Sequence, residues 1–141
     1  MSEKRVTLGI DYGEVRTGVA VSDAMGILAS PVAVLRATSE KALFAEIARI
    51  SAERGATHIV LGYPRNMDGT AGAKAQKCEQ IAERLRRRLN LPVTLWDERL
   101  STVSAHRTLN EVNVRGQKRK DIVDAVAAVT ILQGYLDYKV S

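Results

Sequence analysis

The stretch Val6-Thr-Leu-Gly-Ile-Asp11 decides the fold, because an apolar segment of strand length ends there on a carboxylate. The run of apolar side chains predicts a buried strand. A carboxylate at such a position is costly unless it is paired, hydrogen-bonded or bound to a cation. Asp97 and Glu98 close a second apolar segment, and Asp124 lies within a third. Three separate apolar segments that each supply an acid predict one shared site, most simply a divalent metal site.

The remaining pattern predicts five strands and four helices. The expected strands are residues 6–11, 18–22, 27–35, 59–61 and 93–96. The expected helices run from a cap at Ser39 to about residue 54, from the end of a 63–72 loop to about residue 89, and over 101–109 and 121–138. Residues 110–120 are expected to form a polar, basic loop.

This order of elements indicates an α/β fold. An opening three-strand meander followed by alternating helices and strands predicts a five-stranded mixed sheet flanked by helices, in a single domain over residues 1–141. Ligand sites in such sheets lie beyond the carboxyl ends of the parallel strands. Asp11 and the pair Asp97 and Glu98 fall at carboxyl ends of expected strands, which supports one shared site.

Composition agrees with a globular cytoplasmic protein. Of the 141 residues, 45% are hydrophobic and 26% are charged, which is typical of globular chains. We expect no membrane association, because no apolar run reaches the length of a membrane span and the N-terminus lacks a signal-peptide core. The single cysteine, Cys78, cannot form an internal disulfide, and its helical spacing predicts inert core packing.

The charge distribution favours a polyanionic partner. The formal net charge is +5 and the isoelectric point about 9.6. Two basic clusters are candidate surfaces for a nucleic-acid backbone, although each is equally consistent with an ordinary solvated surface. The clusters are Arg84, Arg86, Arg87 and Arg88 at one helix end, and Arg115, Lys118, Arg119 and Lys120 in the expected basic loop.

Several motifs follow one another along the chain. They are Leu8-Gly-Ile-Asp-Tyr-Gly13 with Thr17-Gly-Val-Ala20, Val60-Leu-Gly-Tyr-Pro64, Asn66-Met-Asp-Gly-Thr70, Asp97-Glu-Arg-Leu-Ser-Thr102, and Asp124-Ala-Val-Ala-Ala128 with Ile131-Leu-Gln133. In these motifs the chain resembles the YqgF/RuvX family of the ribonuclease H-like superfamily, relatives of RuvC-type Holliday junction resolvases. The resemblance runs nearly end to end and implies a ribonuclease H-like fold.

The resemblance also implies metal-binding acids at Asp11, at the pair Asp97 and Glu98, and at Asp124. The motif leaves open which member of the pair faces the metal; we favour Glu98, with Asp97 and Asp121 as further candidates. Two Mg²⁺ or Mn²⁺ ions about 4 Å apart activate a water and stabilise the leaving oxygen in phosphodiester hydrolysis. Hard cations of this kind prefer carboxylate oxygens. Alternatively, Asp121 caps the last helix, which would place Asp124 in its first turn.

The activity that the resemblance implies is that of a metal-dependent nuclease, a hydrolase that trims the 5′ end of precursor 16S ribosomal RNA during ribosome biogenesis. The first alternative is a Holliday junction resolvase acting on branched DNA, which requires a two-fold dimer. The second is a non-catalytic nucleic-acid-binding or ribosome-assembly protein. Expected partners are precursor rRNA or branched DNA and ribosomal particles, with the chain a monomer or a homodimer.

An actin-like ATPase half is a weaker interpretation of the turn from Asp11 to Gly18. Those ATPases surround Mg²⁺ and nucleotide phosphates with a similar turn, but they duplicate the fold, and this chain has length for one half.

Residues near the acids are weaker candidates for contacts with nucleic acid. Arg99 offers a planar donor fork to a phosphate, or it orients a neighbouring acid instead. Tyr12 and Trp96 are expected to pack in the core rather than stack on bases, whereas the loop residue Tyr63 is a weak candidate. The complete set of candidate contacts is Arg16, Arg65, Asn66, Arg99, Arg115, Lys118, Arg119 and Lys120.

Overall fold

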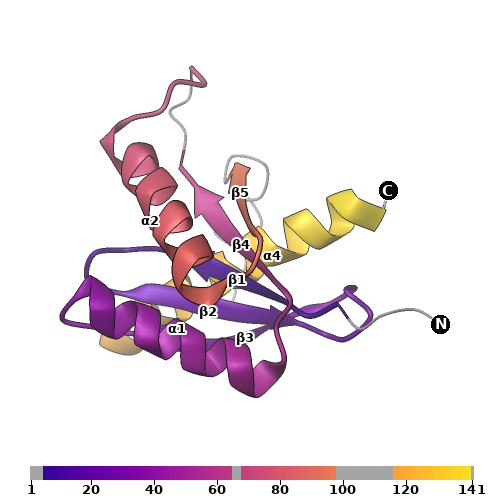
Figure 1. The fold of residues 1–141 in the computed structure, drawn as a ribbon. Coiled ribbons are helices and arrows are strands. Elements are labelled where there is room, and N and C mark those ends of the chain that lie inside the picture. Colours follow the sequence, from indigo (N-terminus) through magenta and orange to yellow (C-terminus); the bar gives the residue numbers. More distant parts are fainter. Residues whose placement is uncertain (1–4, 65–67, 98–115, 141) are drawn as a thin grey trace.

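The computed structural model describes residues 5–64, 68–97 and 116–140, with side chains in the last helix described for residues 125–139. The strands are β1 (Thr7–Asp11), β2 (Thr17–Ser22), β3 (Ala29–Leu35), β4 (His58–Tyr63) and β5 (Val93–Asp97). The helices are α1 (Glu40–Arg54), α2 (Ala73–Leu89) and α4 (Gly116–Val140) (Figure 1). None of the helices in these ranges combines the length and hydropathy that a membrane span requires.

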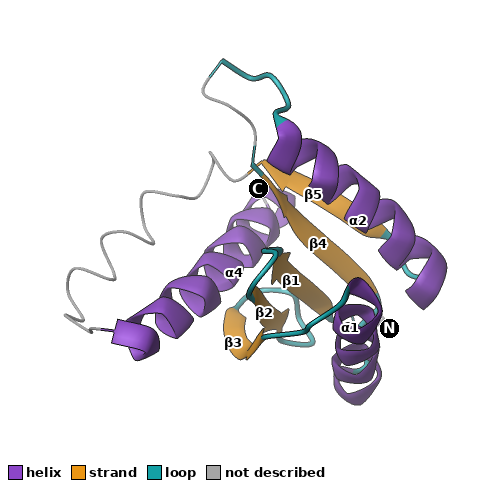
Figure 2. Ribbon diagram, turned by 90° about the vertical axis from the view of Figure 1, so that its left-hand side faces the viewer, coloured by secondary structure: helices purple, strands orange, loops and turns teal. Residues whose placement is uncertain are grey.

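The five strands form one mixed sheet in the order β3-β2-β1-β4-β5. β1 pairs antiparallel with β2, and β2 antiparallel with β3, so the first three strands form the expected meander. β4 joins β1 in parallel, and β5 joins β4 in parallel. Helix α4 covers one face of the sheet, whereas α1 and α2 cover the other (Figure 2). The predicted five-stranded mixed sheet flanked by helices is therefore confirmed.

Helix α1 has the ends that its sequence predicts. The Ser39 side chain accepts a hydrogen bond from the backbone N–H of Ala42 (3.1 Å), which satisfies one of the free donors at the start of the helix. Gly55 ends the helix in the left-handed conformation, with φ = 65°. The apolar side chains at helical spacing, Leu43, Phe44, Ile47 and Ile50, are all buried.

Each face of the sheet carries its own hydrophobic core. On the α1 and α2 side, strand residues such as Leu8, Ile10 and Leu61 pack with Ile47 of α1 and Ile81 of α2. Cys78 is buried in this core, as its spacing predicts. On the α4 side the core is made by Ala20, Val60, Ala128, Ile131, Leu132, Tyr135 and Leu136.

Gly9 permits the close approach of α4 to β1. A Cβ atom at this position would lie 2.6 Å from the Cβ of Leu132 and 3.1 Å from the carbonyl oxygen of Ala128. Real Cβ atoms essentially never show the shorter of these contacts, so only glycine lets the helix backbone rest against the strand at this point.

Strand β3 begins at Ala29, two residues later than predicted. The Asp23 carboxylate accepts hydrogen bonds from the backbone N–H groups of Ile27 (2.7 Å) and Leu28 (3.3 Å), which turns this segment into a loop. The side chain of Gln133 then bonds both sides of the junction: it accepts from the N–H of Ala29 (2.9 Å) and donates to the carbonyl of Ile27 (2.8 Å). These bonds tie α4 to the start of β3.

The last helix starts earlier than expected, which corrects two predictions. Because α4 begins at Gly116, Asp121 lies inside the helix and does not cap it, and Asp124 does not lie in the first turn. Residues 116–120, expected to be part of a loop, are helical. The physical reason is that Gln, Lys and Arg are good helix formers, so charge alone was a poor indication of a loop.

Candidate active site

Asp11 occupies the carboxyl end of β1 and belongs to the face of the sheet that α4 covers. Side chains alternate between faces along a strand, so Asp11 shares its face with Gly9, which touches α4. Its cross-strand partner in β2 is Gly18. On the other side, Gly62 of β4 lies next to Asp11, because the preceding residues of the two strands, Leu61 and Ile10, are paired. The neighbouring positions on both adjacent strands are therefore glycines.

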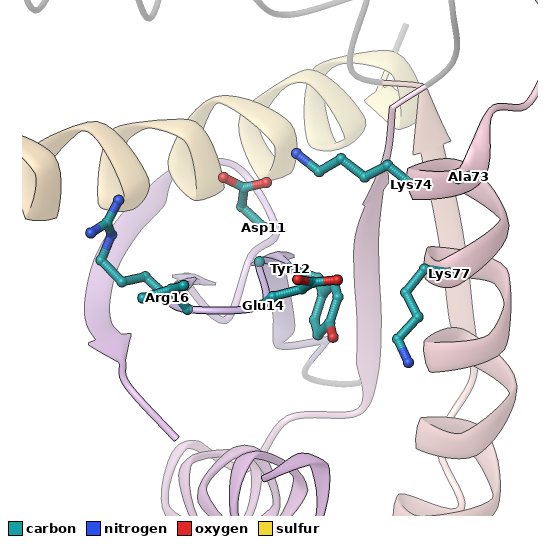
Figure 3. A pocket seen from close by; sticks show the side chains of 9 residues that line it. Asp11, Tyr12, Glu14, Arg16, Ala73, Lys74 and Lys77 are labelled. Carbon is teal, nitrogen blue, oxygen red and sulfur yellow. The ribbon is translucent and has the colours of Figure 1, made fainter. Parts of the chain in front are cut away.

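A pocket of about 770 Å³ opens at this edge, between the β1–β2 turn and the start of α2. Asp11 and Glu14 contribute carboxylates to its lining, and Arg16, Lys74 and Lys77 contribute cations. In Figure 3 the Asp11 carboxylate lies beside α4, Lys74 extends toward it from α2, and Arg16 extends toward another turn of α4. The pocket thus combines two acids with three basic groups, which are the kinds of group that bind a cation and a phosphodiester.

Lys74 and Lys77 are the functional candidates that sequence analysis missed. They lie in the first two turns of α2, where the helix N-terminus already carries a partial positive charge. The positive charge of Lys77 is partly compensated by Glu40, with 3.9 Å between the Nζ of Lys77 and the Oε1 of Glu40. The sequence feature that could have indicated them is a pair of lysines, three residues apart, that follows the 63–72 loop. That spacing places both on one side of a helix at the same edge as Asp11.

The structure does not bring Asp97 together with Asp11. In the register of β4 and β5, Asp97 lies opposite Tyr63. Trp96, the residue before Asp97, packs on the α4 side. By alternation Asp97 belongs to the face covered by α1 and α2, together with Leu95, which packs in the core on that side. Asp97 and Asp11 therefore lie two strands apart and on opposite faces of the sheet.

The other predicted acids are positioned only through their backbone or lie outside the described residues. Glu98 is outside them. Asp121 and Asp124 lie in α4, and Asp124 comes one helical turn before Ala128, whose carbonyl oxygen approaches Gly9. Among the side chains that the structure describes, no three His, Cys, Asp or Glu residues lie close enough together to hold a metal ion.

The predicted nucleic-acid contacts are distributed unevenly. Arg16 lines the pocket beside Asp11. Lys118, Arg119 and Lys120 belong to the beginning of α4 rather than to a loop. Four further candidates lie outside the described residues: Arg65, Asn66, Arg99 and Arg115.

The arginines of α2 lie toward the opposite end of the helix from Lys74. Arg84 to Arg88 follow Lys74 by ten to fourteen residues, which is roughly 15–20 Å along the helix axis. Arg84 is engaged with Glu40, with 2.6 Å between the guanidinium and the carboxylate. Arg86 binds Glu83 (3.1 Å) and the carbonyl of Val93 (2.8 Å), which joins α2 to β5. Arg84 and Arg86 therefore hold α2 to neighbouring elements, and neither is among the described residues that line the pocket around Asp11.

Tyr12, Tyr63 and the turn formed by Asp68 and Thr70 have structural roles near the pocket. Tyr12 packs against the core beside α2, as predicted, and burial, helped by Glu14, Glu40 and Cys78, raises the pKa of its phenol. Tyr63, predicted as a loop residue, is the buried last residue of β4. The Asp68 carboxylate accepts hydrogen bonds from the N–H (3.0 Å) and hydroxyl (2.7 Å) of Thr70, so both residues stabilise the turn before α2.

The arrangement of the sheet places the protein in the ribonuclease H-like class. RuvC of Thermus thermophilus superposes with a TM-score of 0.60 at 12% sequence identity and covers 96% of both chains. The Fowlpox virus resolvase, solved with Holliday junction DNA, superposes with a TM-score of 0.61 at 10% identity, covering 96% of this chain and 99% of the resolvase. At these identities the likeness establishes the fold, which is that of the RuvC-like resolvases.

The chain belongs to the RuvX family, described as Holliday junction resolvase, whose profile matches residues 5–138. A relative from Desulfitobacterium hafniense is 50% identical over 93% of this chain and 91% of its own length. A relative from Myxococcus xanthus is 47% identical over 93% of this chain and 87% of its own. Both relatives carry the name "Putative pre-16S rRNA nuclease". The resemblance inferred from the motifs is confirmed.

Proposed function

We propose that this protein is a divalent-metal-dependent nuclease that hydrolyses phosphodiester bonds at the 5′ end of precursor 16S ribosomal RNA in the cytoplasm. The observation that carries the proposal is the pocket at the carboxyl edge of the sheet, where Lys74 extends toward Asp11 and where Arg16 and Lys77 belong to the same lining. The names of relatives that are about half identical over nearly the whole chain support the choice of substrate.

The pocket fits a hard divalent cation. Its acidic donors are the carboxylates of Asp11 and Glu14, and neither histidine nor cysteine lines it, which matches the oxygen ligands that Mg²⁺ and Mn²⁺ prefer. We propose Asp11, Glu98 and Asp124 as the ligands. Asp124 is supported by its place one turn before Ala128, where α4 touches β1. Glu98 is preferred to Asp97 because alternation along β5 assigns Asp97 to the opposite face.

Asp11 and the three cations of the pocket have distinct roles in the proposed hydrolysis. When bound, divalent ions supply Lewis-acid stabilisation and a water of lowered pKa. The Asp11 carboxylate holds its ligand position from the rigid end of β1. Lys74, Lys77 and Arg16 bind the non-bridging oxygens of the substrate backbone and hold it over the acid. In a pocket partly shielded from solvent these cations interact with phosphate more strongly than at an open surface.

Junction resolution is the second candidate function, and the description of the family favours it. A resolvase must cut two strands symmetrically, so it requires a two-fold dimer, whereas an RNA-trimming enzyme does not. A chain that sediments as a monomer at working concentration in the presence of a four-way junction would exclude symmetric resolution.

The direct test is a cleavage assay on precursor 16S rRNA and on a four-way DNA junction, run with Mg²⁺, Mn²⁺ or EDTA. We expect cleavage of the RNA with either ion and none with EDTA. Asp11→Asn keeps the size of the side chain but removes its charge. The variant should lose at least about 100-fold in rate, as expected when one group that stabilises charge in the transition state is removed, while RNA binding is retained.

Glu53→Gln is the control, because it removes one carboxylate charge from an exposed side chain of α1 that pairs with Arg49, away from the pocket. It should cleave at close to the rate of the unaltered protein, whereas Glu98→Gln should resemble Asp11→Asn. RNA binding without metal-dependent cleavage in the unaltered protein would support the non-catalytic alternative and contradict the proposal.

A further inference from the structure

Most aromatic side chains of this chain gather around one pocket at the edge strand β5. The sequence holds one tryptophan, four tyrosines and one phenylalanine. The tryptophan, Trp96, and three of the tyrosines, Tyr63, Tyr135 and Tyr138, line a pocket of about 610 Å³. Tyr63 belongs to the core on the α1 and α2 side, whereas the rings of Trp96, Tyr135 and Tyr138 contact one another at the α4 side of the edge strand. These three rings are a candidate surface for planar ligands.

The rings form a contiguous cluster that is open to solvent at one end. The ring centroids of Trp96 and Tyr135 lie 5.9 Å apart in an edge-to-face arrangement, and those of Trp96 and Tyr138 lie 5.5 Å apart at a tilt of 57°. Tyr135 is 8% exposed, so it anchors the cluster in the core. Tyr138 is 69% exposed, which is unusual for a ring of this size beside an apolar pocket. Most of the Tyr138 side chain is therefore accessible to solvent.

The charges around the aromatic cluster differ between its two sides. Lys139 places its Nζ 5.8 Å from the centroid of the Tyr135 ring, so a cation borders the aromatic surface. Two acids, Glu79 and Asp97, line the opposite part of the pocket, toward α2. A phosphate is therefore favoured on the Lys139 side of the cluster and disfavoured on the side of the two acids.

The aromatic cluster shares one row of the sheet with Asp11 of the proposed active site. Trp96 is paired with Gly62 of β4, and Gly62 lies beside Asp11 of β1, so the three residues form one row on the α4 face. Two strand spacings separate Asp11 from Trp96, roughly 10 Å. Because the residue between them is a glycine, no side chain of β4 stands between acid and ring. This separation corresponds to one or two nucleotides of an extended strand.

We propose that Trp96 and Tyr138, supported by Tyr135 and bordered by Lys139, form a stacking subsite for unpaired bases of a single-stranded nucleic acid next to the scissile bond. Every base has a planar face, so such stacking is tolerant of sequence. The inference rests on the proposed nuclease function for its substrate, and it narrows that substrate: a strand with unpaired nucleotides beside the cleaved bond, and not a continuous duplex, whose bases are inaccessible.

The test uses Trp96 as its own reporter, because it is the single tryptophan of the chain. A short, unstructured RNA oligonucleotide is titrated into the full-length protein in EDTA, so that binding is followed without cleavage. Stacking at the cluster should quench the tryptophan fluorescence in a saturable manner. A blunt RNA duplex of the same sequence should quench it much less at equal concentration. Equal quenching by duplex and single strand, or none by either, overturns the inference.

Tyr138 provides matched variants that leave the fold intact, since its side chain is mostly exposed. Tyr138→Phe retains the ring and should bind single strands as the unaltered protein does. Tyr138→Leu keeps apolar bulk without a ring, and its affinity should fall about tenfold, within the range found for removal of one stacking partner. Equal affinity of the Leu and Phe variants would overturn the inference, and thermal melts of both verify that they are folded.

Cleavage of precursor rRNA, measured in parallel with Mg²⁺, separates the two proposals. Cleavage without tryptophan quenching retains the nuclease and overturns the stacking subsite. Quenching specific for single strands without cleavage supports the subsite and overturns the nuclease.

Discussion

Gly9 and Asp11 show how much of this site depends on single residues. They lie two positions apart on the same face of β1, and one admits the helix while the other supplies the acid. The contact of α4 with Gly9 sets how far the helix stands from the strand, and thereby how close Asp124 can come to Asp11. The shape of the proposed metal site thus depends on an absent side chain as well as on the acids.

Gly9→Ala is predicted to displace α4 from β1. The added methyl group would meet the Cβ of Leu132 at 2.6 Å, and neither partner is the flexible end of a long side chain. Overpacking of a close contact costs about 1–3 kcal/mol of the free energy of unfolding. Urea denaturation should show this loss, and the cleavage rate of the folded variant should fall as well. A variant with unchanged stability and rate would show that α4 does not need this close contact.

Helix α2 is the element that adds positive charge to the pocket. Its N-terminal end carries Lys74 and Lys77 at the acidic edge, while its C-terminal end is engaged with neighbouring elements through Arg84 and Arg86. The two ends of one helix therefore have different roles, binding at one and stability at the other. A count of basic residues cannot separate these roles, whereas their positions along the helix do.

Replacing Lys74 and Lys77 by glutamine should weaken RNA binding and its dependence on salt. Removing one cation that binds a phosphate lowers the slope of log affinity against log salt concentration by about 0.7 for a single strand. The affinity is measured by fluorescence anisotropy over a range of salt concentrations. Arg49→Gln is the control, since it removes one positive charge from a side chain paired with Glu46 and Glu53 on α1. An equal change of slope per charge in the control would show that the two lysines do not bind phosphates of the RNA directly.

At the scale of the whole molecule, stability depends on a sheet that is covered on both faces. Strand β4 lies in this sheet between its parallel neighbours β1 and β5. His58 begins this strand, with its Nδ1 2.7 Å from the hydroxyl of Thr57. Burial lowers the pKa of His58 from its ordinary value of 6.5, and the positive charges of Arg5 and Lys139 act in the same direction. The folded protein therefore favours the neutral imidazole.

The free energy of unfolding should consequently fall as the pH drops below about 6.5. In the window between the lowered pKa of folded His58 and the ordinary value of 6.5, the unfolded chain binds more protons than the folded one. Stability is then gained as the pH rises through this window and is complete above it. Chemical denaturation at pH 7.5, 6.5 and 5.5 measures the trend. His58→Gln should show a smaller decline over the same range, and an identical decline would assign the effect to other groups.

Local patterns were sufficient for most of the fold. The cap at Ser39, the stop at Gly55 and the apolar strand that ends at Asp11 are decided by residues a few positions apart, so they were predicted correctly. The start of α4 was not, because the helix-forming tendency of residues 117–120 and their charge pointed to different structures. Asp121 was consequently predicted to be a cap and is an interior residue of the helix.

The sequence by itself determined the element order, the family and the fact that an acid stands at the carboxyl end of β1, since these depend on local periodicity and motifs. Only the tertiary structure decided that Asp97 faces away from Asp11, that Lys74 and Lys77 border the acid, and that Trp96 shares a row with it across Gly62. The physical reason is that a side chain's face follows from the pairing register of strands. That register depends on contacts between residues far apart in the chain.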